Sequence, residues 1–406
     1  MSLAAILIAV GITIGTGSLY RFVYNYNLIM AATLFIMFAV IIFQQFIPIV
    51  SNDSNLSNPL NEKFSIPGII IISFMIFIPL LSDIINLSFA YEMIYFYIAM
   101  VLLSFLLDYH FREKILQIYL SIIVILSAIS IVFLFFAIFT DILSYLPHLK
   151  LNVKMNSDLF YVFSYNPSMV WFRNQSIFWE PGAFGFHLIF ATLLSYKNKN
   201  KLFIAILILT CITTFSTTVF IFLILLSLYH IFLGKNKIKS FVVVVGIVLV
   251  SITSIVIIMD NLLIPQLIMS ALIGKFNPSS SNYISFVGRA SFTIEALKMF
   301  LDNILLGAGH YATAEKLEVV KSGATVNTSG FAGLLAEFGL FGVFCIFLYI
   351  RYFWYFSLLA IPITIIWLNG EFLQYSPLAL LILVHSADEF SYRLFPSNLI
   401  APEKSN

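Results

Sequence analysis

The sequence predicts an all-α polytopic membrane protein with about twelve transmembrane helices and two long extracytoplasmic loops. Of its 406 residues, 61% are hydrophobic and 10% are charged, whereas an average soluble domain has roughly 25% charged residues. Apolar runs long enough to cross a hydrocarbon core of about 30 Å recur along the chain. The short loops between these runs show a strong bias in their basic residues. The three observations exclude a soluble globular fold and indicate one membrane domain, residues 1–406.

Apolar runs of spanning length supply most of these helices. They lie near residues 3–19, 27–50, 66–82, 89–107, 115–139, 179–196, 241–259, 331–349 and 352–368. The stretch 202–233 is too long for one span, and a Thr/Ser-rich run at 213–218 interrupts it. We therefore expect two short helices that meet at a polar turn. A last, weaker span covers about residues 375–387.

The basic residues of the short loops predict the sidedness. With the N-terminus inside, the predicted cytoplasmic loops hold Lys63, Arg112, Lys114, Lys197, Lys199, Lys201, Lys235, Lys237, Lys239 and Arg351. The short outer loops hold only Arg21. Because basic residues mark the cytoplasmic face, both termini are predicted to be inside. The long connections 140–178 and 260–330 are then outside, and we expect the function on the extracytoplasmic face.

The charge balance and the cysteines exclude several classes of function. The formal net charge is only +2, so the chain has no basic field that would attract nucleic acid. Cys211 and Cys345 lie inside apolar runs, where a thiol usually behaves as a small hydrophobe. The sequence contains neither a DxD nor an HExxH motif. We therefore expect no disulfide, no metal and no other cofactor.

The first long outer loop ends in Arg173 and Phe178-Trp179-Glu180-Pro181-Gly182, directly before a span. Proline suits the first turn of a helix, and a carboxylate there faces the positive end of the helix dipole. Glu180 is therefore either a plain helix cap or part of a site. His187 follows it by seven residues on the same helical face. Charged and titratable groups aligned at the mouth of a span indicate a functional site.

The second long outer loop contains Gly288-Arg289 followed by a predicted amphipathic helix that would suit the membrane interface. Its apolar positions are Phe292, Ala296, Met299 and Phe300. The alternative is a surface helix on which Arg289 snorkels. Since no metal motif is present, Arg173 and Arg289 would supply the positive charge for a pyrophosphate. A guanidinium fork binds phosphate oxygens bidentately and stays charged.

Further polar residues follow in the same loop and in the next span. Leu306-Gly307-Ala308-Gly309-His310 predicts a flexible turn that brings backbone amides and an imidazole together, although a lone loop histidine is more often solvated. Asn327 lies at the lip of the span 331–349, and Glu337 lies about two turns inside it. A carboxylate at that depth in the membrane raises the free energy of the folded protein unless it is paired with another polar group or hydrated. Glu337 is therefore expected to face a polar cavity or to hydrogen-bond another span.

These segments, in this order, resemble the superfamily of O-antigen polymerases (Wzy) and O-antigen ligases of bacterial inner membranes. The resemblance rests on Arg173 with 178–182, Gly288-Arg289, the turn 306–309, and Asn327 ahead of Ala336-Glu337-Phe338-Gly339-Leu340-Phe341-Gly342. Each motif is short, and together they cover about residues 171–342 of the chain. Ligases of this kind usually have His directly before the Asn, whereas this sequence has Val326. That difference favours a polymerase and leaves the general base open.

The resemblance implies a GT-C-like glycosyltransferase that joins undecaprenyl-pyrophosphate-linked oligosaccharides on the periplasmic face of the inner membrane, without metal or nucleotide sugar. Arg173 and Arg289 would neutralise the leaving pyrophosphate, and Glu180 would accept a proton or orient Arg173. Substrate binding or the base role would fall to His187, His310, Asn327 and Glu337. Membrane lipid, a chain-length regulator and a flippase are the expected partners.

Two alternatives stay open at this stage. A ligase would transfer a finished glycan to lipid A core in the same cavity. A flippase for lipid-linked oligosaccharide is the more distant alternative. Transporters typically show repeats and broken helices at the midplane, whereas the polar residues here cluster near the outer ends of the spans.

Overall fold

A computed structural model of the chain describes a mostly helical fold. The described residues are 2–16, 109–140, 142–147, 149–150, 158–160, 162–165, 173–233, 281–310, 312–313, 329–369 and 376–394, with single residues at 73, 77, 81, 84 and 98. The spans expected at 27–50 and 241–259, nearly all of those at 66–82 and 89–107, and Asn327 lie outside them.

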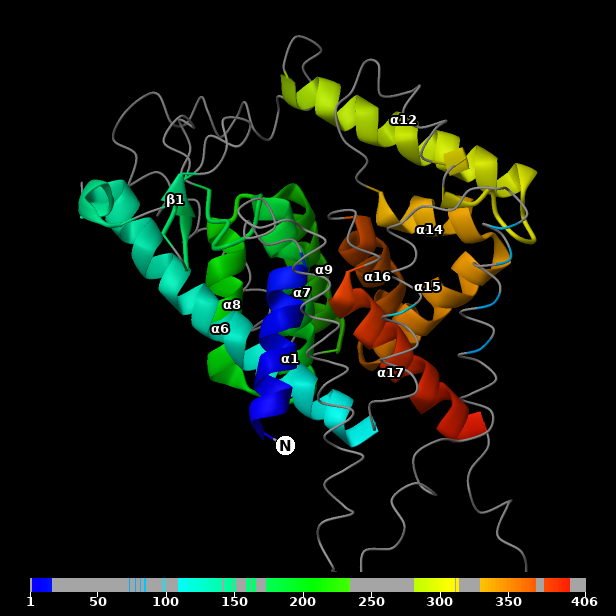
Figure 1. The fold of residues 1–406 in the computed structure, drawn as a ribbon, viewed down its shortest axis with the longest axis horizontal. Helices are drawn as coiled ribbons and strands as arrows, with labels where there is room; N and C mark the ends of the chain where they lie inside the picture. Colours follow the sequence, from blue (N-terminus) through cyan, green and yellow to red (C-terminus); the bar gives the residue numbers. More distant parts are fainter. Residues whose placement is uncertain are drawn as a thin grey trace, which may run out of the picture.

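The described helices account for the remaining predicted spans. They are α1 (Ser2–Gly15), α6 (Tyr109–Phe139), α7 (Pro181–Lys197), α8 (Lys201–Thr213), α9 (Thr217–Leu233), α12 (Ser281–Asp302), α14 (Gly330–Phe338), α15 (Leu340–Tyr352), α16 (Ala360–Asn369) and α17 (Pro377–Leu394), with 3-10 helices η1 (Ile142–Tyr145) and η4 (Trp354–Leu359). Helix α6 packs beside α1, α7, α8 and α17. Figure 1 shows α12 lying across one side of the molecule, next to α14.

One described helix, Tyr109–Ile138 within α6, is long and apolar enough to cross a membrane by itself. Helices α15 and α16, joined through η4, pass the same test together, but they are bent by 113°. Ser357 inside η4 has a φ of 53°, which breaks the helical path. The predicted span 352–368 is therefore a kinked segment that starts as a 3-10 helix and continues as α16.

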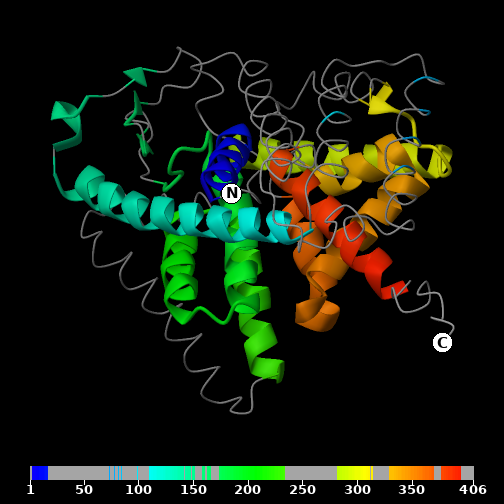
Figure 2. The same cartoon turned by 60° about the horizontal axis from the view of Figure 1, so that its bottom comes forward.

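The break predicted within 202–233 is confirmed. Helix α8 ends at Thr213 and α9 begins at Thr217. In the turn between them, the Thr214 hydroxyl donates to the Cys211 carbonyl at 2.8 Å and accepts from the Ser216 amide at 3.2 Å. Short hydroxyl side chains compete with the helix for backbone groups, which explains why the chain turns here. Figure 2 shows the two helices, in green, extending away from α6.

The predicted span 331–349 is not one continuous helix. Gly339 separates α14 from α15, with φ 56° and ψ −131°. A β-carbon at this position would lie 2.4 Å from the Ile304 carbonyl oxygen and 2.6 Å from the Gly307 nitrogen. Only glycine tolerates this conformation and this close approach. Glu337 therefore lies in the last turn of a short helix, beside a break, and not in the middle of a long span.

The first predicted outer loop contains a small sheet, which the all-helical expectation did not include. Strands β1 (Leu149–Lys150), β2 (Asp158–Leu159) and β3 (Ser164–Tyr165) pair antiparallel in that order. Each has two residues, so the sheet shapes the loop without changing the helical class of the fold.

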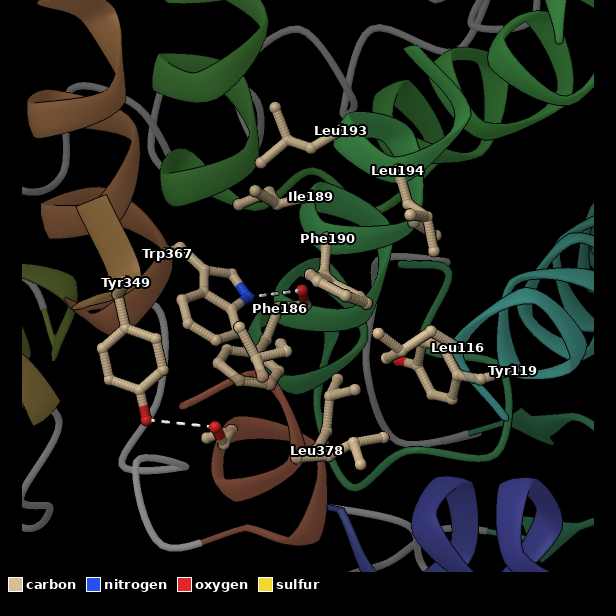
Figure 3. Packing of buried hydrophobic residues seen from close by; sticks show 14 of the residues in the cluster. Leu116, Tyr119, Phe186, Ile189, Phe190, Leu193, Leu194, Tyr349, Trp367 and Leu378 are labelled. Carbon is tan, nitrogen blue, oxygen red and sulfur yellow. Dashed lines mark hydrogen bonds between the residues drawn. The ribbon is translucent and has the colours of Figure 1, made fainter. Parts of the chain in front are cut away.

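The core is built around Trp367 of α16, which fills the space between α7 and α15 (Figure 3). Its ring stacks on Phe186 with centroids 4.4 Å apart and meets Tyr349 edge-on at 5.4 Å. The indole N–H donates to the Phe186 carbonyl at 3.1 Å, and the Tyr349 hydroxyl donates to the Ala379 carbonyl at 3.2 Å. Each large aromatic residue thus buries its ring while its polar atom finds a partner.

Residues predicted to share the cytoplasmic end lie together. The buried Arg112 of α6 forms an ion pair with the partly exposed Asp388 of α17. The Lys197 ammonium at the end of α7 lies 5.6 Å from the centre of the Tyr352 ring at the end of α15. These contacts join the ends of α6, α7, α15 and α17, while the sidedness of this end stays a prediction.

Candidate functional site

The Arg173 segment lies on the turn between α8 and α9, at the end of the helices predicted to face outward. The Arg173 guanidinium donates to the Thr214 carbonyl at 3.3 Å and to the Phe215 carbonyl at 3.0 Å. The backbone N–H of the adjacent Asn174 donates to the Thr213 carbonyl at 3.0 Å. The Thr/Ser-rich turn and the arginine therefore form one polar surface.

Asn174 joins this surface to α6, a role that no motif in the sequence indicates. Its side-chain amide donates to the Ser130 hydroxyl at 2.9 Å and to the Thr213 hydroxyl at 3.0 Å, and its oxygen accepts from the Ser176 amide at 3.2 Å. Asn174 is fully buried. It joins the loop to two helices and gives Arg173 a rigid base.

Glu180 occupies the N-cap position of α7, with Pro181 in the first turn as expected. Its carbonyl accepts from the Phe184 amide at 3.2 Å. Its side chain makes no capping hydrogen bond to the helix. Glu180 therefore faces the positive end of the helix dipole without a side-chain capping bond, and both alternatives, a helix cap and a site residue, stay open.

His187 lies inside the core and not at the mouth of the span. The ring is 0% exposed, and its centre is 4.1 Å from that of Phe178. The ring nitrogen Nε2 lies 2.7 Å from the Thr16 carbonyl and must donate to it, because a carbonyl only accepts. The other ring nitrogen, Nδ1, forms a hydrogen bond with the Tyr119 hydroxyl at 2.5 Å. Both nitrogens are thus engaged with α1 and α6, and we leave His187 out of the proposed site.

The helix predicted around Arg289 is present as α12 and is longer than the motif alone suggested. Three of its four predicted apolar positions pack on α14, and its placement at the membrane interface stays a prediction. Phe292, Ala296 and Met299 are buried in a cluster with Ala332 and Ala336 of α14. Arg289 belongs to this helix, and its side chain lies outside the described residues.

The turn after α12 interlocks with the break between α14 and α15. The Ala308 amide donates to the Ala336 carbonyl at 2.8 Å, the Gly309 amide to the Glu337 carbonyl at 3.2 Å, and the Leu340 amide to the Ile304 carbonyl at 2.7 Å. A β-carbon on Gly307, where φ is 76°, would lie 2.2 Å from the Glu337 carbonyl oxygen. Two of the segments that carry the family resemblance therefore form one structural unit.

The amides of this turn are not arranged to hold a phosphate. The Gly307 amide donates to the Asn303 carbonyl at 2.8 Å, and the two amides that follow donate to the end of α14. An anion site needs backbone N–H groups that point at the ligand. The glycines allow the turn to pack closely against the end of α14. The candidate site residue in this turn is therefore His310.

His310 and Glu337 lie together, which the sequence did not predict. The His310 Nδ1 is 3.3 Å from the Glu337 Oε2. The carboxylate is 2% exposed and the imidazole 12% exposed. Glu337 was expected to face a polar cavity or another span, and the polar group that the structure places beside it belongs to a loop turn.

The other candidates are not brought together by any contact among the described residues. Asn327 lies outside these residues, although the nearby Ser329 caps α14 by accepting from the Ala332 amide at 3.3 Å and donates to Asn369 at 2.7 Å. In the described part of the chain, no three His, Cys, Asp or Glu side chains gather as a metal site would require.

The described structure is mostly helical, and Arg173, Glu180, His310 and Glu337 lie in loops or at helix ends. A family model described as O-antigen ligase matches residues 202–347, from α8 into α15. Over these residues the chain is similar to O-antigen ligases, in line with the resemblance that the sequence motifs indicate. Neither the curated proteins nor the solved structures compared with the chain gave a match.

Proposed function

We propose that this protein is a surface polysaccharide polymerase. It transfers a glycan from one undecaprenyl-pyrophosphate-linked oligosaccharide to the terminal sugar hydroxyl of another, on the periplasmic face of the inner membrane and without a metal. The observation that carries the proposal is that Arg173 is fixed on the turn between α8 and α9, in a chain that matches a family model described as O-antigen ligase. A fixed guanidinium is preorganised for a leaving pyrophosphate.

Each site residue has a role in this proposal. Arg173 and Arg289 stabilise the negative charge that develops on the pyrophosphate as the glycosidic bond forms. Glu180 takes the proton of the acceptor hydroxyl or orients Arg173. His310, Asn327 and Glu337 bind the sugar or supply the base. Apolar grooves between the helices hold the polyprenyl chains, and a flippase and a chain-length regulator are the partner proteins.

The residue directly before Asn327 favours a polymerase over a ligase. Val326 stands where ligases that the chain resembles usually carry a histidine. The matched family model is described as O-antigen ligase, so transfer of a finished glycan to lipid A core is the second candidate.

Deleting the gene in its host and separating the surface polysaccharide on a gel distinguishes these functions. If the protein is a polymerase, the deletion leaves a single repeat unit attached to its acceptor. Reintroducing the unmodified gene restores the ladder of longer polysaccharide chains on the gel. Bare core with long polymer on the lipid carrier would indicate a ligase. Lipid-linked repeat units trapped inside the cell would indicate a flippase and would overturn the site assignment.

A further inference from the structure

We propose that Asn174 is a positioning residue for the transfer reaction and that it acts through the neighbouring Arg173 guanidinium. The side chain and the backbone N–H of Asn174 tie the loop to the turn between α8 and α9, and this tie sets where the guanidinium lies. The inference rests on the proposed function and deepens it, because that function assigns a role to Arg173 and none to Asn174.

Arg173 and Asn174 together hold three consecutive residues of the turn. The Asn174 backbone N–H donates to the Thr213 carbonyl at 3.0 Å. The Arg173 guanidinium donates to the next two carbonyls, those of Thr214 at 3.3 Å and Phe215 at 3.0 Å. A long arginine side chain has much rotamer freedom, so bonds from its terminal atoms alone do not fix its backbone. The bond one residue further on restrains that end, and the Arg173 side chain is held at both of its ends.

The Asn174 side chain extends this connection to α6. Its amide NH₂ group donates to the Thr213 hydroxyl at 3.0 Å and to the Ser130 hydroxyl at 2.9 Å. Each hydroxyl donates its own hydrogen to its own helix, Thr213 to the Thr210 carbonyl at 2.7 Å and Ser130 to the Ser127 carbonyl at 2.9 Å. A hydroxyl has one donor and two acceptor sites. Both hydroxyls are therefore arranged to accept, and the two N–H groups of one amide supply the donors.

The oxygen of the Asn174 side chain completes the arrangement. It accepts from the Ser176 backbone N–H at 3.2 Å, and because a backbone N–H can only donate, this bond fixes which way the amide points. Asn174 is 0% exposed, and a buried polar network with every member satisfied is rigid. Aspartate would place an oxygen where the two hydroxyls need a donor. The network therefore selects an amide at this position, directly beside the arginine of the proposed site.

The test follows initial rates of polymer formation by the full-length protein in liposomes, with lipid-linked repeat units extracted from the deletion strain. We expect Asn174→Ala to lower kcat about tenfold to 10²-fold, because a misplacement of about 1 Å is enough for such a loss. The KM for the lipid-linked unit should change little, since Arg173 acts on charge that develops in the transition state. Thr213→Val, which lacks the accepting hydroxyl, should also lower kcat, and Thr213→Ser, which keeps it, should match wild type.

Two comparisons separate positioning from a merely structural role. In an Arg173→Lys background, Asn174→Ala should cause a much smaller loss than in the wild-type background, because the guanidinium that Asn174 positions is already absent. Ser386→Ala is the matched control. Ser386 is buried, and its hydroxyl joins α17 to α15 by donating to the Leu348 carbonyl at 2.7 Å. This variant also loses a buried bond between helices, but it should keep the wild-type kcat.

The outcomes distinguish failure of the positioning role from failure of the proposed function. A wild-type kcat in Asn174→Ala, or an equal loss in the Arg173 and Arg173→Lys backgrounds, would overturn the positioning role and leave the polymerase function in place. If Asn174→Ala does not fold, the same pair of backgrounds with Thr213→Val decides the question. A wild-type protein that makes no polymer would overturn the proposed function, and the positioning role with it.

Discussion

At the residue scale, Arg173 shows how a charged side chain can be prepared for a ligand by protein contacts. Its guanidinium donates to two successive carbonyls at the turn between α8 and α9. These bonds fix the plane of the group before any substrate arrives. A guanidinium has five N–H donors in a fixed fork, so one group can hold the turn and still carry its charge toward a phosphate.

Lysine should not replace arginine at this position. Arg173→Lys keeps the charge, but a single ammonium cannot reproduce the fork that bonds both carbonyls. The loss of one hydrogen bond to a charged group, roughly 1.5–3 kcal/mol, corresponds to at least about a tenfold lower rate of polymer formation. The measurement is the initial rate with the variant in liposomes. A variant with the wild-type rate would show that the fork geometry is not used.

His187 illustrates the opposite case, a titratable side chain that serves packing. Its ring bonds α1 through Thr16 and α6 through Tyr119, and it is not accessible. The sequence correctly placed it on the same helix as Glu180, but spacing along a helix does not reveal which neighbours pack against that face. Only the tertiary arrangement showed that both nitrogens already have partners.

Replacing this histidine should affect stability more than activity. His187→Ala leaves a cavity and removes partners from two buried polar groups, at a cost of about 2–4 kcal/mol. Tyr119→Phe removes one of the two bonds and should cost about 1 kcal/mol. Thermal unfolding in detergent gives the stabilities, and the rate per folded molecule should remain near wild type. A His187→Ala variant that is stable but inactive would show that His187 belongs to the functional site.

At the element scale, the breaks between helices position the candidate site. The break at 213–217 could be predicted because a run of hydroxyl side chains marks it in the sequence. The break at Gly339 could not, since the chain stays apolar on both sides of it. Its cause is non-local, the approach of the turn at 304–309 to the backbone of α14 and α15. For the same reason, no local pattern indicated that His310 and Glu337 would meet.

The two glycines at this junction should tolerate no side chain. Gly307→Ala and Gly339→Ala place a β-carbon 2.2 Å and 2.4 Å from backbone oxygens, at positive φ. Each should destabilise the protein by at least about 1–3 kcal/mol and disturb the His310–Glu337 pair. Leu305→Ala, in the same turn but 72% exposed, is the matched control. Alanine variants as stable and as active as the control would show that the interlocked turns do not support the site.

At the scale of the whole molecule, the contacts sort into two ends that agree with the distribution of basic residues. Arg112, Asp388 and Lys197 lie at one end, and the Arg173 surface lies at the other end of α7. The composition and the loop charges predict the sidedness of these two ends, because a bilayer constrains every loop in the same way. The small sheet in the first outer loop was not predictable from two-residue strands.

Cysteine labelling tests this sidedness directly. Tyr145, in η1, is 84% exposed, and Lys199 lies in the exposed connection between α7 and α8. A membrane-impermeant maleimide should label Tyr145→Cys in intact spheroplasts and Lys199→Cys only after permeabilisation. The native Cys211 and Cys345 are buried, so the unmodified chain is the background control. Labelling of both positions from the same side would contradict the predicted topology.

The central claim is that this chain alone forms glycosidic bonds between lipid-linked repeat units. The most direct measurement is to incubate the purified protein in liposomes with such units and a metal chelator, and to separate the products on a gel. We predict a ladder of polymer, with one polyprenyl pyrophosphate released for each bond formed, and loss of both products in Arg173→Ala. No ladder, together with glycan transfer when lipid A core is added, would contradict the account and identify a ligase.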